Sequence, residues 1–239
     1  MKQITKEWPI TNLRCVGFID IMGFKDMVQR NKHETIYEMM KKIDATQELN
    51  RSIPWSNKGN LISMTTFSDS IIVYSRDNTY DSLYSFICTM SSLTNDLLSL
   101  GIPHKGACAY GRMTIDTKKS IFFGQPLIDA YLLEEEVNFY GIIMHSTMEE
   151  RFDYFTQRKK DFVFTQEYEC LFKTGKAKHS VIYPFYAHTG VISAEHPKRA
   201  EELFESVKKF RFKTSGGIRK YIDETLKFLC HIRPEYNER

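Results

Sequence analysis

The chain has 239 residues, of which 42% are hydrophobic and 26% charged, enough for one sizeable core or for one domain with an appendage. Its 33 basic and 30 acidic residues leave a net charge of +3, and no apolar run approaches the roughly 18 residues of a membrane helix, so neither a nucleic-acid nor a membrane partner is expected. The five cysteines form no Cys-x-x-Cys pair and the N-terminus has no apolar signal core, which is typical of a cytoplasmic protein with reduced thiols.

The first half of the chain predicts elements in the order strand, helix, strand, strand, helix, strand. Apolar runs without breakers predict buried strands, and apolar positions with helical spacing predict amphipathic helices. The expected strands are 13–21, 61–67, 70–74 and 107–113; the expected helices are 22–49, with 31–33 as a candidate break, and 80–100. Gly101 and Pro103 end the last helix, and Pro54 and Gly59 place a loop at 50–60.

The second half predicts shorter elements and ends in helices. The expected strands are 121–123, 140–144, 162–164 and 181–186; the expected helices are 127–137, 147–152, 197–210 and 217–232. Gly124 and Pro126 mark the start of the first of these helices. We therefore expect an N-terminal arm at 1–12, one domain at 13–187 and a C-terminal helical extension at 188–239.

The order of the first elements is that of the split βαβ, or ferredoxin-like, arrangement, which predicts an α+β fold with helices packed on one face of the sheet. In this arrangement the first strand lies beside the hairpin formed by 61–67 and 70–74. Asp20 lies at the end of the first strand, and Asp69 lies in the turn of the hairpin. The two carboxylates are therefore expected to lie close together, although they are far apart in sequence.

Two neighbouring carboxylates favour a metal site for phosphoryl transfer. Carboxylates bind hard divalent cations, and a pair of such cations stabilises the attacking and leaving oxygens of an in-line displacement. The backbone carbonyl of Ile21 offers a further oxygen ligand. The alternative is that Asp20 only caps a helix and Asp69 is only a turn residue. Each is the commoner role of a single Asp, but the strand order favours the shared site.

The residues that follow Asp20 suit a phosphate group. Met22, Gly23 and Phe24 stand where the helix at 22–49 begins, and backbone N–H groups at such a start bind anions. Gly23 has no side chain, so a triphosphate can approach the backbone closely. Together with Asp20, these residues predict a metal–nucleotide site.

Four short motifs resemble those of class III nucleotidyl cyclases. They are residues 18–24, 67–71, 105–111 and 124–134. The first two are similar to the two metal motifs of the family, with Ser68 where a glycine is usual. The other two are similar to a strand and a helix that follow. The likeness runs from Leu13 to Tyr186 in order and spacing.

This resemblance implies a class III cyclase core in which Asp20, Ile21 and Asp69 hold two Mn²⁺ or Mg²⁺ ions per active site. It also implies a homodimer whose active sites lie between the subunits. In the implied reaction the 3′-hydroxyl of a nucleoside triphosphate attacks its α-phosphorus and pyrophosphate leaves, which would make the protein a lyase.

Several positions depart from the purine cyclases. Thr65 and Ile121 stand where those enzymes read a purine base, and neither can make a charged contact. Ile128 and Leu132 replace the Asn and Arg that steady the transition state. The altered pattern, including residues 130–134, resembles the pyrimidine cyclases of bacterial Pycsar anti-phage systems, which make cyclic UMP or cyclic CMP and pass it to an effector protein.

Four further residues are candidates with stated alternatives. Arg112 is the first candidate to replace the missing Arg, because its planar fork suits an α-phosphate; otherwise it is a strand-end surface residue. Tyr131 could contact the nucleotide or belong to the core, and Lys176 could contact the triphosphate or be a solvated hairpin lysine. Glu134 matches the family's helix motif, but within three successive glutamates it reads as part of a solvated helix end.

The predicted function is a homodimeric pyrimidine nucleotide cyclase that converts UTP or CTP to the cyclic monophosphate and pyrophosphate. The resemblance implies that the product is a second messenger of antiviral abortive infection and activates a downstream effector protein. Thr65 is expected to line the nucleotide site. One alternative is a catalytically degenerate nucleotide-binding module, favoured by the losses at Ile128 and Leu132. A diguanylate-type or polymerase-like palm is disfavoured, because the hairpin turn reads Phe67-Ser68-Asp69-Ser70 and not Gly-Gly-acid-acid.

Overall fold

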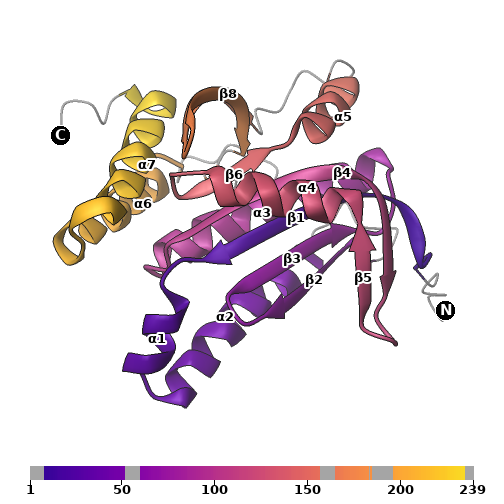
Figure 1. The fold of residues 1–239 in the computed structure, drawn as a ribbon, viewed down its shortest axis with the longest axis horizontal. Coiled ribbons are helices and arrows are strands. Elements are labelled where there is room, and N and C mark those ends of the chain that lie inside the picture. Colours follow the sequence, from indigo (N-terminus) through magenta and orange to yellow (C-terminus); the bar gives the residue numbers. More distant parts are fainter. Residues whose placement is uncertain (1–7, 52–59, 157–164, 183, 185–195, 235–239) are drawn as a thin grey trace.

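The computed structural model describes residues 8–51, 60–156, 165–182, 184 and 196–234 (Figure 1). The strands are β1 (Thr11–Ile21), β2 (Ile62–Phe67), β3 (Ser70–Ser75), β4 (His104–Asp116), β5 (Ile121–Gly124), β6 (Gly141–Met144), β7 (Thr165–Phe172) and β8 (Gly175–Ile182). The helices are α1 (Phe24–Arg30), α2 (His33–Arg51), α3 (Tyr80–Ser99), α4 (Gln125–Glu136), α5 (Ser146–Thr156), α6 (His196–Phe210) and α7 (Arg219–Ile232), with 3₁₀ turns at Arg211–Lys213 and Gly216–Ile218.

All the strands form one sheet, in the order β2-β3-β1-β4-β6-β8-β7, with β5 paired to β4. The part β2-β3-β1-β4 is antiparallel throughout and has the ferredoxin-like order, so the predicted α+β fold is confirmed. β6 then pairs with β4 in parallel, after the crossover through α4. The predicted break in the first helix is also confirmed, because α1 ends at Arg30 and α2 begins at His33.

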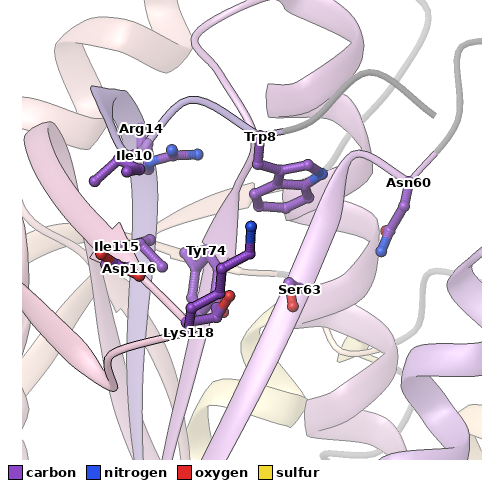
Figure 2. A pocket seen from close by; sticks show the side chains of 10 residues that line it. Trp8, Ile10, Arg14, Asn60, Ser63, Tyr74, Ile115, Asp116 and Lys118 are labelled. Atoms are coloured by element: carbon purple, nitrogen blue, oxygen red, sulfur yellow. The ribbon is translucent and has the colours of Figure 1, made fainter. Parts of the chain in front are cut away.

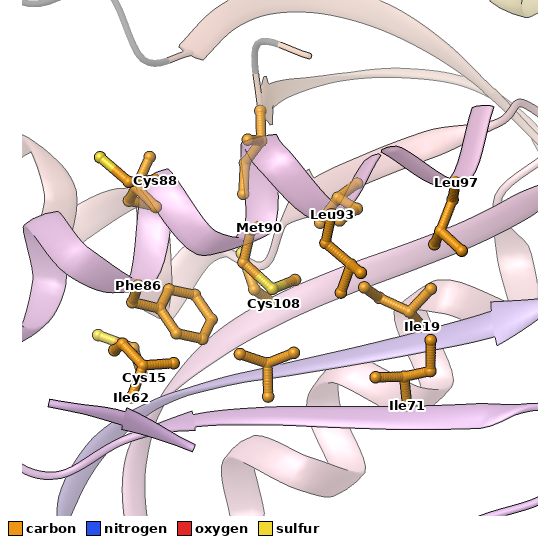
Figure 3. Close-up of a cluster of buried hydrophobic side chains, with 14 of the residues drawn as sticks. Cys15, Ile19, Ile62, Ile71, Phe86, Cys88, Met90, Leu93, Leu97 and Cys108 are labelled. Carbon is orange, nitrogen blue, oxygen red and sulfur yellow. The ribbon is translucent and has the colours of Figure 1, made fainter. Parts of the chain in front are cut away.

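One face of the sheet carries the main core. Side chains alternate between the two faces of a strand, so Ile19 and Cys15 of β1 share a face with Ile71 of β3. The α3 side chains Phe86 and Met90 pack against this face (Figure 3). Each fully buried side chain of this size contributes roughly 1.5–3 kcal/mol. No helix in the described part of the chain has the length and apolar character needed to cross a bilayer.

The opposite face, which bears Asp20, is covered in part by α4. Leu127 of α4 packs with Val16 and Met113, and Tyr131 of α4 packs edge-to-face on Phe18 at a ring-centroid distance of 5.4 Å. The expectation that the helices pack on one face is therefore wrong. The crossover from β5 to β6 carries α4 over the face that α2 and α3 leave open, as Figure 1 shows.

The strands of the β7–β8 hairpin at the edge of the sheet were misplaced. The strand expected at 162–164 lies outside the described residues, and the one expected at 181–186 overlaps only the end of β8. In β7, Cys170 and Phe172 point into the core while Glu167 and Glu169 face solvent. An edge strand with charges on one side has no continuous apolar run, so this alternation was the only sign of it.

The two predicted C-terminal helices are confirmed as α6 and α7, which pack on the end of α3 and on β7. The Tyr140 N–H donates to Thr225 Oγ1 at 2.7 Å and ties α7 to the start of β6. β1 begins at Thr11, within the range expected as an arm, and the expected boundary at 187–188 lies outside the described residues. The division into domains therefore stays a prediction.

Gly106 allows β1 and β4 to approach closely. A Cβ at this position would lie 2.8 Å from the Phe18 carbonyl oxygen and 3.3 Å from Ile19 Cα, both backbone atoms that cannot move aside cheaply. We expect Gly106→Ala to lower the free energy of unfolding by about 2 kcal/mol, as overpacking in a core does. Urea unfolding measures this loss. The matched control is Gly217→Ala, because nothing lies within 4 Å of a Cβ there. Equal midpoints for the two variants would contradict the close approach.

Candidate functional site

The structure brings Asp20 and Asp69 together at one end of the sheet. Asp20 in β1 is the register partner of Ser70 in β3, the residue after Asp69. The Ile21 N–H donates to the Asp69 carbonyl oxygen at 2.9 Å, which fixes the hairpin turn against the end of β1. Ser68 in this turn has a φ of 58°, in the left-handed region, which explains why a glycine is usual at this position in the resembling motif.

The negative charge of Asp69 acts on the Asp20 carboxyl. Asp20 is half-buried, and its pKa is raised, first by burial and then by the negative charge of Asp69, while the positive charge of Lys105 opposes the rise. Two carboxylates that repel each other at the surface fit a divalent cation, which would relieve the repulsion. Within the described residues, no group of three or more His, Cys, Asp or Glu side chains is arranged for a metal. A cation here would therefore complete its shell with phosphate or water oxygens.

Lys105 and Glu134 form a buried ion pair beside Asp20. Lys105 in β4 is the direct register partner of Asp20, so the two side chains share a face. Its Nζ lies 3.0 Å from Glu134 Oε1 and donates to the Glu134 carbonyl oxygen at 3.0 Å. The side chains are only 10% and 4% exposed. Burial raises the pKa of Glu134, while the Lys105 charge opposes the rise. Lys105 thus places a fixed positive charge beside Asp20.

Tyr131 of α4 reaches the same site. Its ring packs on Phe18, two positions before Asp20 in β1, and 42% of the residue is exposed. The pKa of Tyr131 is raised, first by a hydrogen bond with Glu135, with smaller contributions from Glu134 and Asp20. Tyr131 therefore lies near Asp20 with part of its surface exposed, where a bound molecule could contact its ring.

Only two of the three predicted phosphate-binding N–H groups remain open. The Met22 N–H donates to the Pro103 carbonyl oxygen at 2.9 Å and is occupied. Gly23 has a φ of 74°, and a Cβ there would meet nothing within 4 Å, so the backbone at this corner is accessible. Within the described residues, the N–H groups of Gly23 and Phe24 have no acceptor.

Thr65 lies on the same face as Asp20, two strands away. It is the register partner of Ile72 in β3, which in turn faces Phe18 in β1. At about 4.8 Å between strands, its Cα lies roughly 10 Å from β1. Thr65 Oγ1 lies 3.4 Å from the Tyr74 hydroxyl oxygen, so the residue offers a small polar group to anything that lies over this face.

Arg112 and Lys176 are not brought to Asp20 within one chain. Arg112 is seven positions after Lys105 in β4, so it points to the opposite face and lies about 23 Å further along the strand. Lys176 in β8 lies three strands from β1, and its ammonium group pairs with Glu169 at 3.3 Å. Either residue could act on the Asp20–Asp69 pair only across a subunit contact.

The sequence interpretation missed Lys105 and misplaced Glu134. Glu134 is 3% exposed and is not part of a solvated helix end, so that expectation is wrong. Its position could have been found, because Leu127, Ala130 and Glu134 recur at helical spacing along the covered side of α4. A carboxylate in a buried stripe requires a partner, and the Lys105 motif was the nearest source of a cation.

The fold is that of known nucleotide cyclases. The chain is similar to the catalytic core of a rhodopsin-guanylyl cyclase with converted specificity, solved in complex with ATPalphaS, at 13% identity and a TM-score of 0.51 over 74% of this chain and 98% of that one. It also aligns with the adenylyl cyclase CyaB from P. aeruginosa at 13% identity and a TM-score of 0.42, over 74% of this chain and 94% of that one. No protein-family model and no curated protein matches the sequence. The first likeness confirms the class III cyclase core as a fold.

Proposed function

We propose that the protein is a nucleotide cyclase that converts a pyrimidine nucleoside triphosphate, UTP or CTP, into the 3′,5′-cyclic monophosphate and pyrophosphate. The observation that carries this proposal is the pairing of Asp20 and Asp69 at the end of β1, where the charge of Asp69 helps to raise the pKa of Asp20, an unfavourable interaction that a cation would relieve. The cyclase-like fold supports it, because it sets this pair in the same order of elements as the resembling metal motifs.

The residues present fit a pair of divalent cations. The Asp20 and Asp69 carboxylates and the Ile21 carbonyl would hold two Mn²⁺ or Mg²⁺ ions, which would neutralise the triphosphate and favour loss of the 3′-hydroxyl proton. The open N–H groups of Gly23 and Phe24 would bind phosphate oxygens. The N–H of Met22 donates to the Pro103 carbonyl oxygen and so would not bind phosphate.

The proposed reaction closes a ring by forming one bond to the α-phosphorus and breaking another. The 3′-oxygen forms a bond to the α-phosphorus and its proton passes to solvent. The bond from the α-phosphorus to the bridging oxygen breaks, and pyrophosphate leaves with that electron pair. Asp20 would hold a cation beside the α-phosphate and so orient this group. Lys105, ion-paired to Glu134, stabilises Asp20 in its ionised form.

The pyrimidine preference rests on small neutral groups at the base-reading positions. Thr65 offers one hydroxyl on the Asp20 face, and Ile121 is 44% exposed and apolar. A site that recognises a base through one or two hydrogen bonds discriminates against analogues that leave those groups unpaired. Tyr131 would contribute a ring face or its hydroxyl to the nucleotide.

A homodimer would complete the site. Large apolar side chains lie exposed on α4, on β5 and at the hairpin tip; they are Phe67, Ile121, Phe123, Ile128 and Leu132. Exposed large apolar side chains of this kind are typical of an association site. Because Arg112 and Lys176 lie far from Asp20 in their own chain, they would serve the active site across the dimer contact.

The biological setting follows from the sequence resemblance to Pycsar cyclases. In this proposal the protein acts in the cytoplasm, its cyclic UMP or cyclic CMP is an antiviral second messenger, and an effector protein that binds the product acts downstream. The nucleotide content of phage-infected cells tests this part separately from the chemistry.

One observation favours a second candidate, a nucleotide-binding module without turnover. Ile128 and Leu132 are 51% and 54% exposed and apolar, so α4 presents no polar group where the resembling family steadies its transition state. This candidate predicts metal-dependent nucleotide binding with no product.

The test is a reaction with each of the four ribonucleoside triphosphates and either Mn²⁺ or Mg²⁺, followed by anion-exchange chromatography. We expect UTP or CTP to yield one cyclic monophosphate for each pyrophosphate released. Conversion of purines alone would refute the pyrimidine specificity. Nucleotide binding that Asp69→Ala removes, with no product from any triphosphate, would establish the binding module in place of the enzyme.

A further inference from the structure

The turn that joins α6 to α7 is rich in positive charge. Residues 206–222 contain no aspartate or glutamate and six lysines and arginines, which are Lys208, Lys209, Arg211, Lys213, Arg219 and Lys220. The net charge of the whole chain is only +3, so the overall composition does not reveal this cluster. Figure 1 shows α6 and α7 at one side of the molecule and β5 at the other.

Acidic side chains neutralise only part of this cluster. Lys208 Nζ lies 3.5 Å from Glu205 Oε1, and Arg211 Nε lies 3.1 Å from Asp223 Oδ1. Three further basic residues are exposed and have no carboxylate of the described residues at ion-pair distance; they are Lys209, Arg219 and Lys220. The Lys220 ammonium group lies over the Tyr221 ring at 5.3 Å, a neutral partner that leaves its charge in place.

The same turn exposes two apolar side chains. Phe212 is 84% exposed and Ile218 is 52% exposed, and each belongs to one of the two 3₁₀ turns between the helices. Arg219 Nη2 donates to the Arg211 carbonyl oxygen at 3.5 Å, so the chain between these two residues forms one closed turn. Phe212 and Ile218 are the first residues inside this turn from its two ends. The turn therefore presents apolar and basic side chains together.

The residues on either side of the turn fix it to the fold. Phe210 and Tyr221 both pack on Tyr140, each at a ring-centroid distance of 5.9 Å. These two aromatic side chains point inward, whereas Phe212 points to solvent. A single exposed phenylalanine is ordinary, but apolar side chains beside a cluster of basic residues are typical of a protein surface that lies on a bilayer.

We propose that the α6–α7 turn binds the surface of a membrane that contains anionic lipids. The basic side chains lie among the headgroups, and Phe212 and Ile218 enter the boundary of the hydrocarbon region. The sequence expectation of no membrane partner was based on net charge and apolar runs, but a bilayer surface responds to local charge within about 10 Å. No residue of this turn belongs to the proposed cyclase site, so this proposal does not depend on the proposed activity.

Ile218 favours a bilayer over a nucleic acid as the partner. Single strands bind basic surfaces through aromatic side chains that stack on the bases, and an aliphatic side chain offers no such stacking. Hydrocarbon, in contrast, takes up isoleucine and phenylalanine alike. A bilayer therefore accounts for both exposed apolar residues of the turn.

Sedimentation of the intact chain with vesicles tests this proposal. The probes are phosphatidylcholine vesicles with and without phosphatidylglycerol, an anionic lipid. We expect binding to require the anionic lipid. Binding should weaken at least about tenfold between about 0.1 M and about 1 M salt, because the Debye length falls from about 10 Å to about 3 Å.

Variants of the turn test the charged and the apolar contacts separately. Lys209→Gln/Lys220→Gln should weaken binding to the anionic vesicles about 25-fold, because each basic residue near such a surface strengthens binding roughly fivefold. Phe212→Ser should weaken it about tenfold, and Phe212→Leu should keep most of it. All of these side chains are exposed, and circular dichroism checks that each variant is folded.

The matched control is Lys118→Gln/Lys119→Gln, which removes the same charge from the turn between β4 and β5. Figure 2 shows Lys118 beside Trp8 and Tyr74, next to the N-terminal end of β1 and away from α6 and α7. Binding of this control should stay within about twofold of wild type, because charge far from the bilayer is screened.

Several outcomes would overturn the proposal. They are no binding to the anionic vesicles, equal binding to both kinds of vesicle, or binding that both Lys209→Gln/Lys220→Gln and Phe212→Ser leave intact. Loss of binding in the β4–β5 control equal to that in Lys209→Gln/Lys220→Gln would also overturn it, since net charge alone would then act. Single-stranded RNA that binds the wild type when anionic vesicles do not would assign the turn to a nucleic acid in place of a membrane.

Discussion

Replacing Asp20 with asparagine should abolish nucleotide turnover and should also make the metal-free protein more resistant to unfolding at neutral pH. Loss of a carboxylate that holds charge at the reacting phosphate should cost at least about a thousandfold in kcat. Asp69→Asn should have a similar effect, because the two aspartates act on the same cations. Product formation from UTP and CTP measures this loss.

The gain in stability follows from the raised pKa of Asp20. A carboxyl whose pKa is raised on folding stabilises the fold fully below its ordinary pKa of 3.8, and loses that contribution as the pH rises through the folded-state value. At pH 7 the ionised Asp20 is therefore unfavourable to the fold without a cation. The asparagine that replaces it carries no charge at any pH, so the difference in Tm between the variant and the wild type should be positive at pH 7 and should shrink as the pH falls toward 3.8.

Asp26→Asn is the matched control. Asp26 is on α1, near Asp20 in sequence, with a 63% exposed side chain that pairs with Arg30 at 3.7 Å. Exposed pairs of this kind contribute about 1 kcal/mol or less, so neither turnover nor Tm should change appreciably. An Asp20→Asn variant that keeps a tenth of the activity would refute the metal-holding role. An equal Tm for Asp20→Asn and the wild type across the pH range would refute the raised pKa of Asp20 as a cost to stability. It would not bear on the metal-holding role, which the turnover measurement tests.

The pair Asp20 and Asp69 could be predicted because both stand at sharp sequence boundaries. An apolar strand ends at Ile21, and a two-residue turn joins 61–67 to 70–74, so element order alone brought the aspartates to one edge. Element order could not show whether the Met22 N–H is free to bind phosphate. Its N–H is taken by Pro103, a contact between segments that only the folded sheet creates.

Which face a residue points to was harder to predict than which strand contains it. Arg112 and Lys105 belong to one strand, yet an odd separation places them on opposite faces, and only the register with β1 shows which of them joins Asp20. The β4 strand runs from His104 to Asp116, well beyond the expected 107–113, because it pairs with β1 along the whole length of that strand. The apolar pattern predicted a strand only at 107–113, and the resembling motif at 105–111 gave no register with β1, so the pairing of Lys105 with Asp20 was not predicted.

Lys105 is also a residue whose loss should damage the fold strongly. Lys105→Met leaves Glu134 buried without its cation, and breaking a buried ion pair in this way costs about 3–5 kcal/mol. The cost arises because a carboxylate that is only 4% exposed must either remain charged without a partner or take up a proton. The pKa of Glu134 and that of Asp20 should both rise further, since Lys105 holds both down. Urea unfolding at pH 7 measures the loss.

The double variant Lys105→Met/Glu134→Leu distinguishes a missing partner from a packing defect. Because replacing a buried ion pair with apolar residues of similar volume is often neutral, most of the stability lost in Lys105→Met should return in the double variant. Turnover should not return with it, because Asp20 would still lack the positive charge that keeps it ionised. Recovery of both stability and activity would mean that Lys105 serves only the core. If neither stability nor activity returns, the aliphatic stem of Lys105 stabilises β4 by itself. The ion pair would then not explain the burial of Glu134.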